Sequence, residues 1–256
     1  AKQQKILRSG TWEEERNLTR VRWFLLEEFA STGQRRGSLE TLALAEKHLQ
    51  DGFSILKLKG GLSPEDDIEK VLKLREHFGE NFILRFDANQ GYSVKDSLNF
   101  LKSVANANIE LFEQPTRKND FEMLKLITQQ SELPVMADES LISLRDAFYL
   151  SSDQCMDLIN IKLMKTGGIL DAMHVNSVAR AAGIGAMVGC MDESALGIAA
   201  GLHFALSRPN IQYADLDGHL DIMDDPFEGM LQIRDGELFP PESPGLGWTG
   251  LQKIHI

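Results

Sequence analysis

The feature that most constrains this chain is the regular alternation of helix-like and strand-like segments from about residue 38 onward. The predicted helices cover residues 39–50, 64–78, 95–106, 120–129, 143–151, 168–182 and 194–207. The predicted strands cover residues 54–59, 81–87, 109–114, 133–139, 157–163, 184–189 and 211–217. Apolar strands that alternate with helices through short connections predict a parallel sheet with the helices packed outside it.

An eighth strand would let this sheet close into a barrel. The segment VRWFLLEEF (residues 21–29) is the candidate, although charged residues interrupt it. The length of 256 residues fits a single α/β barrel. An open doubly wound sheet is the alternative, but no GxGxxG motif follows a strand to support a dinucleotide-binding version of it. We expect the C-terminal stretch ELFPPESPGLGW (237–248) to be turn-rich and to pack irregularly.

The overall composition excludes several functions. The formal net charge is −11 and the sequence pI is about 5.1, which argues against nucleic acid and anionic membranes as partners. The two cysteines, Cys155 and Cys190, form no zinc-binding pattern and fit a reducing compartment. No apolar run has transmembrane length and no signal peptide is recognisable. We therefore expect a soluble, cytoplasmic protein that acts on a small molecule.

Charged residues stand near the carboxyl ends of the predicted strands, where the apolar sequence breaks. They are Lys57, Lys59, Asp87, Glu113, Asp138, Lys162, Asp215 and Asp217. In a barrel the carboxyl ends of all strands converge on one mouth, where active sites lie. We therefore expect these side chains to ring a single cavity.

The residue types predict a metal site flanked by lysines. Three carboxylates brought together repel one another unless a hard divalent cation binds them, and oxygen ligands suit Mg²⁺. Lys57 and Lys59 are two residues apart on one strand and so share a face. We expect this crowding to lower a lysine pKa enough for proton abstraction near neutral pH. The alternative is a surface strand whose lysines reach into solvent.

Five motifs together resemble a known family. KLK, FDAN, FEQP, ADE and IKLMKTGG, in this order and at these intervals, are similar to the enolase superfamily and in particular to its muconate-lactonising subgroup. The resemblance implies a modified TIM barrel of the (β/α)7β type that binds Mg²⁺. By motif, Asp87, Glu113 and Asp138 match the metal ligands of that family.

The lysines match the family's acid/base residues. Lys59 and Lys162 correspond to the two lysines that remove and return an α-proton from opposite faces of an enolate intermediate. Lys57 corresponds to the lysine that contacts the substrate carboxylate and tunes its neighbour. The resemblance therefore implies an isomerase or a related enzyme of enolate chemistry.

The sequence DLD at residues 215–217 narrows the resemblance to the dipeptide epimerases, in which such a pair holds the substrate's free α-ammonium. Asp215 and Asp217 could instead be turn formers before Gly218. The other reactions of the subgroup stay open: muconate cycloisomerisation, o-succinylbenzoate synthesis and N-acylamino acid racemisation. A non-catalytic barrel is the third alternative.

The N-terminal segment departs from the family. Its members carry an N-terminal α+β capping domain, and residues 1–37 do not resemble it. We expect this domain to be missing or remodelled, with residues 1–37 forming an atypical N-terminal segment and residues 38–256 forming the barrel and its C-terminal tail. Barrels of this kind are often symmetric assemblies, so a homo-oligomer is possible.

Overall fold

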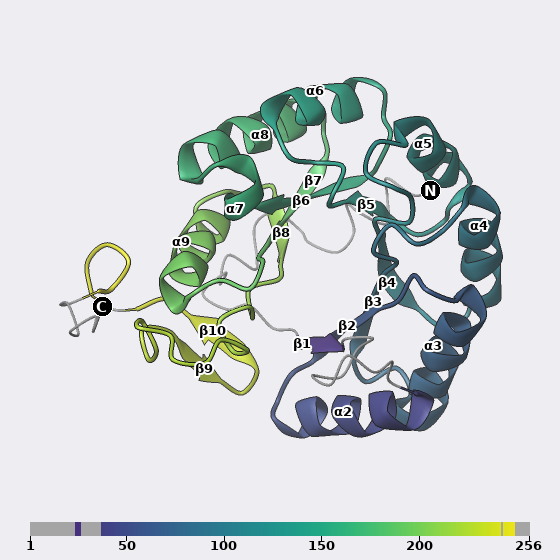
Figure 1. The fold of residues 1–256 in the computed structure, drawn as a ribbon, viewed down its shortest axis with the longest axis horizontal. Helices are drawn as coiled ribbons and strands as arrows, with labels where there is room; N and C mark the ends of the chain where they lie inside the picture. The colour runs from purple at the N-terminus through teal and green to yellow at the C-terminus, as the bar shows by residue number, and fades with distance from the viewer. Residues whose placement is uncertain (1–23, 27–36, 242, 249–256) are drawn as a thin grey trace.

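A computed structural model of the chain describes residues 24–26, 37–241 and 243–248. Its main sheet has eight parallel strands in the order β1 to β8, so each strand lies beside the strand that follows it in sequence. These strands are β1 (Phe24–Leu26), β2 (Ile55–Lys59), β3 (Ile83–Asp87), β4 (Ile109–Glu113), β5 (Val135–Ala137), β6 (Leu158–Lys162), β7 (Gly185–Gly189) and β8 (Ile211–Ala214). The sheet curls round a central axis, and the helices form a ring outside it (Figure 1).

The helices follow the predicted pattern closely. They are α2 (Ser38–Gln50), α3 (Pro64–Phe78), α4 (Val94–Ser103), α5 (Phe121–Gln130), α6 (Leu144–Ser152), α7 (Leu163–Thr166), α8 (Ile169–Ala181) and α9 (Ala195–Leu206). The start of α3 shows why local sequence predicts these ends. The Ser63 side chain accepts a hydrogen bond from the amide of Asp66 at 3.3 Å, and Pro64 occupies the first helical position. The single-turn helix α7 was not predicted.

The predicted TIM-barrel-like fold is confirmed. β1 lies within the candidate segment 21–29 and pairs in parallel with β2. β5 is shorter than predicted, three residues against the expected 133–139. The boundary proposed at residue 38 stays a prediction, since most of residues 1–37 lie outside the described part. Within the described part, no helix is both long and apolar enough to cross a bilayer.

Two apolar layers lie on the two sides of the sheet. The larger one fills the space between strands and helices and includes the fully buried Phe86, Phe100 and Phe112. The smaller one is separate and comes from successive strands: Leu111, Met136, Leu158 and Met187, with Tyr213 packed against them. Side chains two apart on a strand share a face. The smaller layer therefore lies two residues below Glu113 and Asp138, and it forms the floor beneath the charged mouth.

The C-terminal region is more regular than predicted. β9 (Gln232–Arg234) and β10 (Glu237–Phe239) form an antiparallel hairpin, so the expectation of irregular packing is wrong for residues 237–239. The two loop residues, Asp235 and Gly236, have φ values of 52° and 70°. Asp-Gly is a favoured pair for a two-residue hairpin loop, because both positions need positive φ.

Candidate active site

A cavity of about 300 Å³ opens at the carboxyl ends of the strands. Its lining includes seven of the predicted site residues: Lys57, Lys59, Asp87, Asp138, Lys162, Asp215 and Asp217. The eighth, Glu113, is fully buried and contacts the same group through Lys57. The structure therefore brings all eight predicted residues together, as the convergence of strand ends requires.

Lys57 lies at the centre of the charged group and is 2% exposed. Its Nζ lies 2.9 Å from Asp87 Oδ2, 2.8 Å from Glu113 Oε2 and 3.0 Å from Asp215 Oδ2. Burial alone would lower the pKa of Lys57, but the attraction of these three carboxylates outweighs it and raises the pKa well above its ordinary value. These carboxylates, and not the neighbouring ammonium of Lys59, therefore determine the pKa of Lys57.

Asp87, Glu113 and Asp138 come from three neighbouring strands and offer oxygen atoms that all lie within 4.8 Å of one another. All three are buried. Burial, with added repulsion from Asp87, raises the pKa of Glu113 despite the attraction of Lys57. A compact, buried set of carboxylate oxygens fits a hard divalent cation, and the ammonium of Lys57 already shows that positive charge is needed here. These residues could hold a metal ion.

Two lysines share the Asp138 carboxylate. Lys162 Nζ lies 2.8 Å from Oδ2, and Lys165 Nζ contacts Oδ1 and lies 2.6 Å from the Asp138 carbonyl oxygen. Burial would lower the pKa of Lys162, but Asp138 outweighs it and raises that pKa. Burial lowers the pKa of Lys165. Lys165 was not predicted, although its place three residues after Lys162, before two glycines, was visible in the sequence.

Two buried amides support the carboxylates, and sequence reasoning missed both. The side-chain oxygen of Gln114 accepts hydrogen bonds from the amides of Asp138 and Ser140 at 2.8 and 3.1 Å. Asn160 Nδ2 donates to Glu113 Oε1 at 2.7 Å. The sequence did offer a signal for both: each is a polar residue in or beside a buried strand and close to a predicted site residue, and buried polar groups usually have hydrogen-bond partners. Together the amides fix the orientation of the loop after β5 and of Glu113.

Asp217 lies on the side of the cavity formed by the end of β8. It is half-buried, and burial followed by repulsion from Asp215 raises its pKa to about 7. Cys190 Sγ lies 3.8 Å from Asp217 Oδ1 and accepts a hydrogen bond from the amide of Gly218. Burial raises the pKa of the Cys190 thiol, as expected for an inert cysteine. Asp217 also accepts a hydrogen bond from Leu220 through its carbonyl, so it forms a turn as well as lining the cavity.

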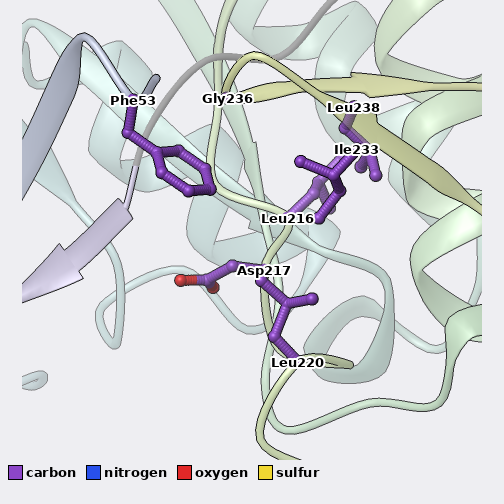
Figure 2. Close-up of a pocket in the computed structure, with 7 residues that line it drawn as sticks. All are labelled: Phe53, Leu216, Asp217, Leu220, Ile233, Gly236 and Leu238. Atoms are coloured by element: carbon purple, nitrogen blue, oxygen red, sulfur yellow. The ribbon is translucent and has the colours of Figure 1, made fainter. Parts of the chain in front are cut away.

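A much smaller pocket meets the site at Asp217. It is lined by Phe53, Leu216, Asp217, Leu220, Ile233, Gly236 and Leu238. Figure 2 shows Phe53 on one side of the pocket and Leu216, Ile233 and Leu238 gathered on the other, with the Asp217 carboxylate pointing away from Leu216 and Leu220. Its volume of about 10 Å³ leaves room for no more than one water molecule. This small pocket therefore cannot hold a substrate.

The fold and the site define an α/β barrel protein with a centre of carboxylates and lysines at the carboxyl ends of its strands. The chain belongs to the enolase C-terminal domain-like family, whose model matches residues 40–252. The predicted resemblance is thereby confirmed.

Curated relatives include the L-Ala-D/L-Glu epimerase of Bacillus subtilis, 41% identical over 82% of this chain and 58% of its own length. The L-Lys-D/L-Arg epimerase of Desulforapulum autotrophicum is 41% identical over 81% of this chain and 59% of its own length. The chain thus spans a little under three fifths of these relatives.

Solved structures of related enzymes have the same fold as this chain. The dipeptide epimerase of Enterococcus faecalis complexed with Mg and L-Leu-L-Tyr has a TM-score of 0.83 and 36% identity, and covers 90% of this chain and 64% of that one. A muconate lactonising enzyme has a TM-score of 0.81 at 29% identity, over 90% of this chain and 63% of its own.

Proposed function

We propose that this chain carries the catalytic centre of a Mg²⁺-dependent dipeptide epimerase, an isomerase that inverts the α-carbon of the dipeptide's C-terminal residue. The observation that carries the proposal is the presence of two kinds of binding group in one cavity. Asp87, Glu113 and Asp138 form one cluster suited to a cation, and Asp215 and Asp217, which follow β8, supply two further acids in the same cavity. Relatives that are named dipeptide epimerases support it.

Asp87, Glu113 and Asp138 would hold Mg²⁺. When bound, the metal supplies positive charge that stabilises the negative charge developing on the substrate carboxylate as its α-proton leaves. The same cation would neutralise Asp138. Since Asp138 is what raises the pKa of Lys162, this lysine becomes a better base once another cation shares that carboxylate.

Lys59 and Lys162 would remove and return the α-proton. They come from β2 and β6, which are separated by three strands in the sheet order, and both line the cavity. Two groups on opposite sides of a planar enolate can exchange a proton with either face, which is what epimerisation requires. Lys57 would bind the substrate carboxylate and orient it once Asp87 and Glu113 hold the metal, because its three donors otherwise face Asp87, Glu113 and Asp215.

Asp215 and Asp217 would select the substrate. A dipeptide is a zwitterion, and these acids would attract its ammonium group while its carboxylate lies at the metal end. Substrates of the alternative reactions, such as muconate or an N-acylamino acid, carry no free ammonium. The pairing of Asp215 with Lys57 leaves Asp217 as the acid freer to meet an ammonium.

Two variants separate the alternatives. Lys162→Ala should abolish inversion of the α-carbon with every substrate, because one face of the enolate loses its acid/base group, while Lys59 can still exchange the proton of one configuration with solvent. Asp217→Ala should raise KM for dipeptides and leave an N-acylamino acid unaffected. Lys125→Ala is the control, since Lys125 on α5 pairs with Asp153 at the surface. Exchange of an N-acylamino acid but of no dipeptide by the wild-type chain would favour racemisation instead.

A further inference from the structure

Lys165 has its hydrogen-bonding capacity fully used inside the site. An ammonium group has three N–H donors. The acceptors around Lys165 Nζ are the Asp138 carboxylate, the Asp138 carbonyl oxygen at 2.6 Å and the Asn160 carbonyl oxygen at 3.3 Å. Its side chain is 13% exposed. Lys165 therefore has no donor left for a substrate, although it borders the cavity.

Lys162 differs in this respect. Its Nζ contacts a single carboxylate oxygen, Asp138 Oδ2, with Met191 Sδ as a weak neighbour at 4.0 Å. It thus keeps donors for a substrate, whereas Lys165 does not. The two lysines hold opposite oxygens of one carboxylate, and only one of them is placed to move a proton.

The short helix α7 reverses the chain after β6 and so directs Lys165 back into the site. β6 ends at Lys162, and the single turn Leu163–Thr166 follows at once. Gly167, with φ of 93°, ends that turn in the left-handed region that favours glycine. The turn places Lys165 beside the strand it has just left, where it reaches the Asn160 carbonyl as well as Asp138.

We propose that Lys165 is a positioning residue that fixes the Asp138 carboxylate in the orientation needed to bind the metal. This inference rests on the proposed function. Lys165 donates hydrogen bonds to both the carboxylate and the carbonyl oxygen of Asp138. These contacts restrict the rotation of the carboxylate and the path of the chain after β5. Through Asn160, whose side chain donates to Glu113, the same lysine is tied to a second carboxylate of the set. Outer partners of this kind typically change metal affinity ten- to a hundredfold.

The direction in which Mg²⁺ affinity changes when Lys165 is replaced distinguishes a positioning role from a purely electrostatic one. If Lys165 acted only as a nearby positive charge, it would repel a divalent cation, and removing it would tighten metal binding. If it positions Asp138, removing it weakens metal binding despite the lost repulsion. Replacement by arginine keeps the charge but not the geometry, because a planar guanidinium cannot make the same three contacts.

The test is a calorimetric titration with Mg²⁺ alone, without substrate, on the full chain. Lys165→Met and Lys165→Arg are compared with wild type and with Lys125→Met, whose lysine lies in a surface ion pair. We expect the Kd for Mg²⁺ to rise at least tenfold in Lys165→Met, by a smaller factor in Lys165→Arg, and not at all in Lys125→Met. Thermal unfolding in EDTA shows whether each variant is folded. If Lys165→Met does not fold, Lys165→Arg decides the question.

Unchanged or tighter Mg²⁺ binding by a folded Lys165 variant would overturn the positioning role. A merely structural role would lower the melting temperature in EDTA but leave the stabilisation added by Mg²⁺ unchanged, which would also overturn it. Failure of the wild-type chain to bind Mg²⁺ is a different result, since it would refute the proposed function itself and this inference with it.

Discussion

Replacement of Lys57 by methionine should cost this chain a large part of its stability. Lys57 is 2% exposed, and its Nζ contacts Asp87, Glu113 and Asp215 at 2.8–3.0 Å. Methionine keeps the length of the side chain but leaves three buried carboxylates without their shared cation. Breaking a buried ion pair by removing one partner costs about 3–5 kcal/mol. A loss of that size is substantial for a domain whose total stability is typically about 5–15 kcal/mol.

The pH at which this loss is measured follows from the pKa of Lys57, which is raised above its ordinary value. A lysine with a raised pKa in the folded state stabilises the fold fully below its unfolded pKa of about 10.4, and loses that effect only as the pH rises through the higher folded value. The whole effect is therefore present at pH 7–8.

Urea unfolding at pH 7.5 in EDTA, followed by circular dichroism, gives the free energy of unfolding directly. Lys125→Met is the matched control, because its pair with Asp153 lies at the surface, where an ion pair contributes little to stability. Saturating Mg²⁺ should stabilise Lys57→Met more than wild type, because the metal no longer competes with an ammonium for the same carboxylates. A loss below about 1 kcal/mol for Lys57→Met in EDTA would refute the reasoning.

Further perturbations address other parts of the site. Gly189→Ala should destabilise the chain by about 1–3 kcal/mol in urea unfolding and slow turnover, because an added Cβ would lie 2.4 Å from Asn160 Oδ1; unchanged stability would contradict this. Since burial and then Asp215 raise the pKa of Asp217 to about 7, the KM for a dipeptide should rise as the pH falls below that value, and a flat profile between pH 8 and 6 would argue against an ammonium at Asp217. The same raised pKa means that Asp217→Asn should be at least as stable as wild type at pH 8, with the difference vanishing below about pH 4. EDTA should abolish α-proton exchange and added Mg²⁺ should restore it, which a proton NMR time course would follow.

The helices and most strands could be predicted from the sequence because their signals are local. Caps such as Ser63 and the spacing of apolar residues act within one element. The gathering of Asp87, Glu113 and Asp138 could also be predicted, since the topology alone brings parallel strand ends together. The hairpin β9–β10 was missed, although its Asp-Gly loop is a local signal too.

The electrostatics of the site could not be predicted in the same way. Lys57 and Lys59 were expected to influence each other as neighbours on one strand, but the carboxylates that raise the pKa of Lys57 come from β3, β4 and the end of β8. Lys165 was overlooked because its role depends on a four-residue helix that turns the chain back on β6. Both depend on contacts between segments distant in sequence, which residue spacing does not reveal.

The central claim is tested most directly by α-proton exchange. The chain would be incubated in D₂O with Mg²⁺ and a mixed dipeptide library, with and without EDTA, and deuterium at each α-carbon would be followed by NMR. The account predicts metal-dependent deuterium uptake at the α-carbon of a dipeptide's C-terminal residue, starting from either configuration. Absence of exchange in every dipeptide, from a chain that binds Mg²⁺ under the same conditions, would contradict it.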